Sequence, residues 1–432
     1  MRPNVPVEFP HDPAVSDVLR DASQGYGWPN FGHNAEMKSL VYHARQRVGL
    51  RTDAPTEGDK KLILSELERQ YSAARWSIPD DFFSYEHFRR VVDGVDMQSS
   101  PGYPYLRKAP SNGVFFQQKP DGSIPEERLR EIWELVQLRI RERDCDPIRL
   151  FIKPEPHKEK KLKNHRYRLI SSVSIMDQLI DAMLFAPMND KIIEECVRVP
   201  CKGGWSPFCG GWKMVPRSGV MSLDKSGWDW SAQFWLFEMD LQLRLRLCKN
   251  VRADWVDLAA WRYKCLFGNP TFVTTGGALL KQLQPGVMKS GCFNTLTTNS
   301  ILQSIVHLRV CLEMDILPGW LWTLGDDTLQ ESIDENRQEY LDRVAQYCHV
   351  KHCVDGAEFA GMRFLGSRVE PLYRGKHSYQ LLHMKQQVAT EMSDSYRLLY
   401  HRSSAKNALH AMLAKISGRM SDDDRDGVWD LW

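Results

Sequence analysis

Apolar residues recur at helical spacing in several segments of the chain. In the range 126–143 they return every three or four positions on an otherwise charged segment, which predicts an amphipathic helix. The same spacing predicts a helix over 294–314, ended by Pro318 and Gly319. The range 234–248 fits both a helix and an alternating strand, and its length favours a helix.

Shorter apolar runs predict strands beside acidic residues. The run 220–223 reads as a buried strand that ends at Asp224. The runs 320–324 and 328–330 are separated by Gly-Asp-Asp, so they predict a tight hairpin. A helical pattern follows over 335–347. Strands and helices therefore intermix, and the predicted fold class is α+β.

Composition excludes several classes of protein. With 432 residues, 42% of them hydrophobic and 26% charged, the chain is neither fibrous nor disordered. Its net charge of +2 means that any grip on nucleic acid must come from local clusters of charge. The ten scattered cysteines, a start without an apolar signal segment and the lack of a long apolar run predict a soluble intracellular protein without a membrane span.

Four aspartates are candidate functional residues. Asp326 and Asp327 at a hairpin tip repel each other unless a cation lies between them, although a solvated acidic turn is the commoner explanation of such a pair alone. Asp224, at the end of a predicted strand, and Asp229 shortly after it bring two more carboxylates. Carboxylates from separate strands could hold two magnesium ions about 4 Å apart.

A polar stretch and a basic stretch complete the set of candidates. Gly291, Thr295 and Asn299 step by four and would share one face of a helix, which suits recognition of a sugar; a helix cap with surface polar residues is the alternative. The range 153–168 holds seven Lys/Arg and two Glu, a local charge of +5 suited to phosphate groups. A solvated run of charges is the alternative there.

Taken in order, these segments resemble the RNA-dependent RNA polymerases of positive-strand RNA viruses. The matching motifs are 99–104 (motif G), 153–170 (motif F), Asp224 with Asp229 (motif A), Ser290, Gly291, Thr295 and Asn299 (motif B) and 325–327 (motif C). The segments 166–185 and 357–361 are most similar to sobemovirus, polerovirus and barnavirus polymerases, in which a cysteine usually stands where this chain has Ala360.

The resemblance implies a right-hand polymerase, with a palm formed by an antiparallel sheet flanked by helices. Its fingers would comprise 1–180 with an insertion at 250–285, its palm 181–249 and 286–368, and its small helical thumb 369–432. It also implies two Mg²⁺ ions, replaceable by Mn²⁺, on Asp224, Asp326 and Asp327.

The remaining roles follow from the same resemblance. The implied nucleotide-binding residues are Lys153, Arg166, Arg168, Asp229, Ser290, Thr295 and Asn299, and the implied template-binding residues are Ser100, Gly102 and Gly291. Lys351 is the candidate general acid, and a plain surface lysine explains it equally well. Its neighbours Cys348, His349, His352 and Cys353 match no common spacing of a structural zinc site.

The resemblance thus implies an enzyme that replicates and transcribes a viral RNA genome from ribonucleoside triphosphates in the host cytoplasm, within a replication complex. A viral protein primer is a further predicted partner. A reverse transcriptase-like polymerase is the first alternative, but such enzymes usually carry an aromatic residue where this chain has Leu324. A non-catalytic RNA-binding viral protein is the second, and it leaves the spaced aspartates unexplained.

Overall fold

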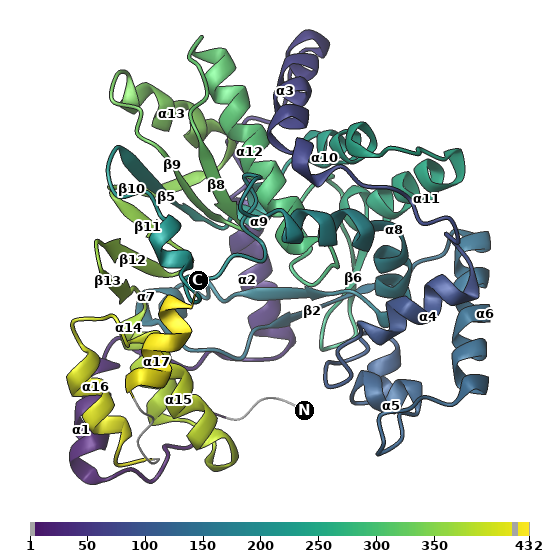
Figure 1. Cartoon of the computed structure of the whole chain (residues 1–432). Coiled ribbons are helices and arrows are strands. Elements are labelled where there is room, and N and C mark those ends of the chain that lie inside the picture. The colour runs from purple at the N-terminus through teal and green to yellow at the C-terminus, as the bar shows by residue number, and fades with distance from the viewer. Residues whose placement is uncertain (1–4, 417–421, 432) are drawn as a thin grey trace.

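The computed structural model describes residues 5–416 and 422–431. Strands and helices are mixed along the whole chain and form several small sheets surrounded by helices (Figure 1). This arrangement confirms the predicted α+β class. In the part of the chain that is described, no helix combines the length and the apolar character that crossing a membrane would require.

A four-stranded antiparallel sheet carries the aspartates. Its strands, in spatial order, are β10 (His349–Asp355), β5 (Val220–Ser226), β9 (Asp327–Glu331) and β8 (Leu321–Leu324). The predicted hairpin is confirmed as β8 and β9. The prediction that the earlier strand ends at Asp224 is wrong: β5 continues to Ser226, because β10 pairs alongside it as far as His349 and satisfies its backbone groups.

Helices surround this sheet. They are α3 (Glu57–Gln70), α8 (Ile175–Glu194), α9 (Trp228–Ser231), α10 (Phe234–Leu247), α11 (Ala253–Tyr263), α12 (Thr295–Glu313) and α13 (Arg337–Tyr347). Of these, α10, α12 and α13 confirm helices that the sequence predicts. The ambiguous range 234–248 is the helix α10. Apolar side chains of α8, α10 and α12 join those of the sheet in the largest hydrophobic core of the described chain.

The helix α12 is buried on every side, since all residues from 297 to 311 are buried. The expectation that Gly291, Thr295 and Asn299 share one helical face is wrong, because the helix begins only at Thr295. The Thr295 hydroxyl donates to the carbonyl oxygens of Lys289 (2.9 Å) and Cys292 (2.8 Å), so the residues before it form a turn. Asn299 alone of the three lies well inside the helix.

A second sheet carries the basic stretch. Its strands, in spatial order, are β4 (Leu169–Ser172), β2 (Ile148–Ile152), β6 (Thr271–Val273) and β7 (Leu279–Lys281). The helices α4 (Tyr85–Asp93), α5 (Asn112–Phe116) and α6 (Glu126–Glu142) lie beyond it on the right of Figure 1, and α6 confirms the first predicted helix. A short ladder joins β1 (Tyr26–Gly27) to β3 (His157–Lys158), which leads into α7 (Glu159–Lys163).

The C-terminal part forms a third sheet and a helical group. The sheet comprises β11 (Ala357–Phe359), β12 (Met362–Leu365) and β13 (Arg368–Pro371), and the helices are α14 (Arg374–Leu382), α15 (Ala389–Leu399), α16 (Lys406–Leu413) and α17 (Asp422–Asp430). The N-terminal helix α1 (Pro13–Ala22) packs against α14 (Figure 1). Residues 417–421 and 432 of the predicted thumb lie outside the described residues.

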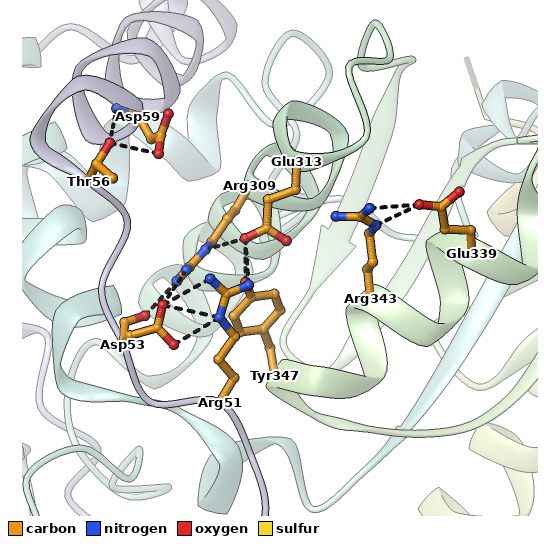
Figure 2. A network of polar contacts seen from close by, with 9 residues as sticks. All are labelled: Arg51, Asp53, Thr56, Asp59, Arg309, Glu313, Glu339, Arg343 and Tyr347. Carbon is orange, nitrogen blue, oxygen red and sulfur yellow. Dashed lines mark hydrogen bonds and ion pairs between the residues drawn. The ribbon is translucent and has the colours of Figure 1, made fainter.

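The N-terminal segment links distant parts of the molecule. After α1 and β1 it passes through α2 (His33–Arg45), which contacts β2 and β4, and reaches α3 beside α10 and α12. Figure 2 shows the ionic network that fastens it: Arg51 and Asp53 of this segment meet Arg309 and Glu313 at the end of α12, together with Tyr347. The ends of α12 and α13 are therefore held by the same segment.

Candidate active site

The turn between β8 and β9 is fixed by the buried helix behind it. Leu324 pairs with Asp327, so only Gly325 and Asp326 form the turn, and Gly325 adopts a positive φ of 62° that favours glycine. The hydroxyl of Ser300 accepts a hydrogen bond from the Gly325 backbone N–H (3.0 Å), and the Gln303 amide donates to the Asp326 carbonyl (3.0 Å). These contacts from α12 hold the exposed Asp326 side chain at the tip.

Asp224 reaches the same end of the sheet from the neighbouring strand. Leu223 of β5 pairs with Thr328 of β9, and one further step of that register brings Asp224 opposite Asp327. Burial raises the pKa of Asp327 to about 7, and repulsion from Asp326 and Asp224 adds to this rise. The structure thus brings Asp224 together with Asp326 and Asp327, which follow it about a hundred positions later in the sequence.

Cations lie close to these acids. Lys351 of β10 donates a hydrogen bond to Asp224 Oδ2, and His352 Nδ1 is 3.6 Å from the same oxygen. Lys225 is buried and donates to the Thr328 hydroxyl (2.9 Å), and burial lowers its pKa. The predicted general acid is therefore paired with one of the predicted metal ligands in this structure.

The carboxylate oxygens of Asp224, Asp326 and Asp327 are the type of ligand that a hard divalent cation prefers. Three carboxylates that oppose one another's ionisation are relieved by a cation with oxygen ligands, as Mg²⁺ prefers. Among the described residues, however, no group of three side chains is already arranged as a metal-binding cluster. Asp224 would have to exchange Lys351 for the cation.

Asp229 and Asn299, two residues predicted to recognise the sugar, are hydrogen-bonded to each other. The Asn299 amide donates from Nδ2 to Asp229 Oδ1 (2.8 Å). Burial raises the pKa of Asp229 to about 6, the hydrogen bond from Asn299 opposes the rise, and the charge of Asp326 adds to it. Asp229 is therefore close enough to Asp326 to experience its charge.

The other residues of the polar stretch, Ser290, Gly291 and Thr295, form hydrogen bonds with backbone groups of neighbouring segments. The hydroxyl of Ser290 accepts a hydrogen bond from the Ser171 N–H (3.1 Å), and the Gly291 N–H donates to the Ser171 carbonyl (3.2 Å). A Cβ atom on Gly291 would lie 2.7 Å from that carbonyl oxygen, so the close approach requires glycine. Ser290, Gly291 and Thr295 thus tie the start of α12 to the end of β4.

The basic stretch surrounds a single acidic residue. Glu155 lies 3.4 Å from Lys153, 3.2 Å from Arg168 and 2.8 Å from Lys376 of α14. These cations lower the pKa of Glu155 to about 2, against the effect of its burial. Lys153 and Arg168, both predicted to bind phosphate, therefore share the carboxylate of Glu155. In the net charge of the basic stretch, Glu155 counts only as one negative charge.

Arg166 lies at the end of β5, whereas Ser100 and Gly102, the residues predicted to bind the template, lie beside the start of α8. Arg166 donates to the Ser226 hydroxyl at the end of β5 and lies over the Tyr42 ring, 5.5 Å from its centroid. Gly102, with φ 68°, packs against the start of α8, where a Cβ atom would lie 2.8 Å from the Val173 carbonyl oxygen. Ser100 accepts a hydrogen bond from the Gly102 N–H (3.3 Å).

Two hollows bear on the position of the site. A small one, about 30 Å³, is lined by residues that include Asp224, Asp327, His352, Glu358 and Tyr373, so it joins the acids to the C-terminal part. A larger one, about 500 Å³, lies among α1, α14 and α16 and has a mainly apolar lining. None of the predicted site residues lines the larger hollow.

Several functional candidates were missed in the sequence. Ser300 and Gln303 hold the turn, Glu155 collects the cations, and Trp228 contacts Asn299. The spacing of Ser300 and Gln303 on a predicted helix before the hairpin was a usable signal. Trp228 carried none, because Asn299 is 71 positions away in the sequence. Glu155 lies close in sequence to Lys153 and Arg168, but its contact with Lys376, 221 positions away, left no signal.

Comparisons with known proteins give consistent results. A family model described as "Viral RNA-dependent RNA polymerase" matches residues 85–354, more than half of the chain. Protein P1-P2 of Pea enation mosaic virus-1 is 30% identical over 379 residues, covering 76% of this chain and 30% of that protein. Replicase polyprotein P2AB of Southern cowpea mosaic virus is 31% identical over 360 residues, covering 76% and 36%.

The chain spans about a third of the length of these curated relatives. Among solved structures, the Sicinivirus 3Dpol RNA dependent RNA polymerase superposes with a TM-score of 0.73 at 14% identity, covering 99% of this chain and 96% of that one. The fold similarity thus extends over nearly all of both chains, and the predicted right-hand architecture is confirmed.

Proposed function

The chain belongs to the viral RNA-dependent RNA polymerases, and we propose that it extends RNA from ribonucleoside triphosphates on an RNA template. The convergence of Asp224, Asp326 and Asp327 at one end of the central sheet carries this proposal. Three carboxylates this close oppose one another's ionisation, a divalent cation relieves that repulsion, and nucleotidyl transfer uses such ions.

We infer that these three carboxylates hold two divalent ions, Mg²⁺ or Mn²⁺. When bound, such ions favour ionisation of the attacking hydroxyl and stabilise the leaving pyrophosphate. The role of the protein is to fix the three oxygen donors, and the grip of Ser300 and Gln303 on the turn supports this role. Lys351 pairs with Asp224 until a cation replaces it, after which its ammonium is available as a proton donor.

The basic stretch would neutralise the triphosphate. Lys153 and Arg168 are both held by Glu155, which keeps two long side chains in place before substrate binds. Arg166, anchored on Ser226 two residues after Asp224, brings a third positive charge to the same end of β5. Fixed cations of this kind stabilise charge that develops on phosphate oxygens.

Ribose selection is proposed for Asp229 and Asn299. A 2′-hydroxyl donates one hydrogen bond and accepts others, so a carboxylate and an amide placed side by side match it. This pairing favours a ribonucleotide polymerase over the reverse-transcriptase alternative. The protein primer and the host-cytoplasmic location stay predictions.

The proposal is tested with purified protein, a primed homopolymer template, labelled ribonucleotide and Mg²⁺ or Mn²⁺. We expect the wild-type chain to extend the primer, and Asp326→Ala to reduce extension by at least a hundredfold with nearly unchanged RNA binding. Asp334→Ala, which removes an exposed aspartate eight positions further along, is the matched control and should behave as wild type. Normal extension by Asp326→Ala would refute the assignment of the acids.

A further inference from the structure

A chain of two hydrogen bonds connects a buried tryptophan to the predicted sugar-binding pair. Trp228 Nε1 donates to Asn299 Oδ1 (3.1 Å), and Asn299 Nδ2 donates to Asp229 Oδ1 (2.8 Å). Trp228 and Asn299 are only 2% and 4% exposed, so water competes little for these bonds. Trp228 is not among the residues to which the sequence motifs assign a role.

These bonds select one of the two orientations of the Asn299 amide. In the observed orientation its oxygen accepts from the indole N–H and its NH₂ group faces the carboxylate. Rotation of the amide by half a turn would place its oxygen against Asp229 and its NH₂ group against the indole N–H. Both contacts would then be repulsive, because like partners would face each other.

The selected orientation determines what the pair offers to a ligand. With the NH₂ group turned towards Asp229, a donor and an acceptor lie side by side, which is the pattern that a hydroxyl group matches. With the amide reversed, two acceptors would lie side by side, and a hydroxyl with one hydrogen could satisfy only one of them. The indole N–H thus decides whether the pair suits a 2′-hydroxyl.

The position of Trp228 is itself fixed by the central sheet. Gly227, with φ 65°, turns the chain out of β5 directly before the short helix α9 that contains Trp228. The ammonium of Lys225 lies over the indole ring, 5.9 Å from its centroid, and donates to Thr328 of β9. The indole is therefore held by the same strands that carry the catalytic acids.

We propose that Trp228 is a positioning residue for sugar discrimination: its indole N–H orients the Asn299 amide so that Asn299 and Asp229 together recognise the ribose 2′-hydroxyl. This inference rests on the proposed function, since it concerns selection between ribonucleotides and deoxyribonucleotides.

The test compares kcat/KM for ATP and dATP in wild type and in Trp228→Phe, which keeps an aromatic ring and removes the N–H. We expect kcat/KM for ATP to fall about three- to tenfold, as for a lost buried hydrogen bond, with the dATP value nearly unchanged. A merely structural role would lower both values by the same factor. An unchanged ratio would overturn the inference.

Controls separate the possible causes. Trp230→Phe alters the other tryptophan of α9, which stacks on His43, and should leave the ratio unchanged. In an Asn299→Ala background, Trp228→Phe should reduce discrimination no further, because the amide that it orients is gone. If Trp228→Phe does not fold, replacement of Trp228 by benzothienylalanine removes the N–H with almost no change of shape and gives the same expected result.

The two proposals fail in different ways. Failure of the wild type to extend the primer would refute the proposed polymerase activity, and extension that Asp326→Ala does not reduce would refute the assignment of the acids. Suppose instead that Asp326→Ala loses extension as expected, while the ratio of kcat/KM for ATP to that for dATP is unchanged in Trp228→Phe and in the benzothienylalanine variant. That result would refute only the role of Trp228.

Discussion

Asp229 shows how burial and neighbouring charge act on one carboxylate. Its ordinary pKa of 3.8 is raised to about 6, chiefly by burial, with a further contribution from Asp326. The hydrogen bond from Asn299 acts in the opposite direction but is outweighed. The ionised form is thus held in the folded protein at a cost, as is common at sites that bind charged ligands.

This cost predicts how stability depends on pH. Between pH 4 and pH 6 the folded chain retains a proton on Asp229 that the unfolded chain has lost, so the contribution of this group to stability falls as pH rises through that window and stays low above it. In metal-free buffer at pH 8, Asp229→Asn should therefore unfold about 1–3 °C higher than wild type.

The gain should shrink as the pH falls towards 4 and vanish below it, where Asp229 of the wild type is protonated in both the folded and the unfolded state. Thermal unfolding followed by circular dichroism at several pH values measures it. Asp334→Asn, at an exposed site, is the control and should show no such trend. An equal effect of Asp229→Asn at every pH would contradict the explanation.

At the scale of elements, α12 organises the site. Its first half supplies Asn299 to the proposed sugar-binding pair and Ser300 and Gln303 to the turn, and its last turn joins the ionic network of the N-terminal segment (Figure 2). Glu313 accepts hydrogen bonds from Arg51 (2.9 Å), Arg309 (3.0 Å) and the Tyr347 hydroxyl (2.7 Å). One carboxylate therefore fastens three segments.

Glu313→Gln should destabilise the protein by about 1–3 kcal/mol, because Arg309, only 3% exposed, loses part of its counter-charge. Chemical unfolding monitored by tryptophan fluorescence provides the measurement. Glu339→Gln is the matched control, since it breaks an exposed pair with Arg343 in the same figure and should cost less than about 0.5 kcal/mol. Equal costs in both variants would contradict the role of the network.

At the scale of the whole molecule, two contacts join α14, a helix of the C-terminal part, to segments far from it in the sequence. The helix α1 packs against α14, and Lys376 of α14 pairs with Glu155 at 2.8 Å across 221 positions of sequence. Since Glu155 also holds Lys153 and Arg168, the C-terminal helices are connected to the predicted phosphate-binding groups.

Loss of this ion pair should loosen α14. In Lys376→Met, we expect backbone amides of α14 to exchange with deuterium about two- to fivefold faster, because the pair is largely shielded from water. Lys385→Met, at an exposed position after α14, should leave that exchange unchanged. Unaltered exchange in Lys376→Met would show that α14 is held by its apolar contacts alone.

The sequence alone determined the local elements and the order of the chemical groups. Periodicity identified α6, α10 and α12, and the Gly-Asp-Asp turn between apolar runs identified the β8–β9 hairpin, because such patterns depend on neighbours within a few residues. The order and spacing of the motifs also identified the family.

Only the tertiary structure decided where β5 ends, which groups hold Asp224 and Asn299, and that Glu155 meets α14. The strand extends because β10 pairs with it more than a hundred positions later, and Trp228 reaches Asn299 across 71 positions. Contacts between residues so far apart leave no periodic trace in the sequence. They form only when packing of the helices and sheets brings the two partners to the same place.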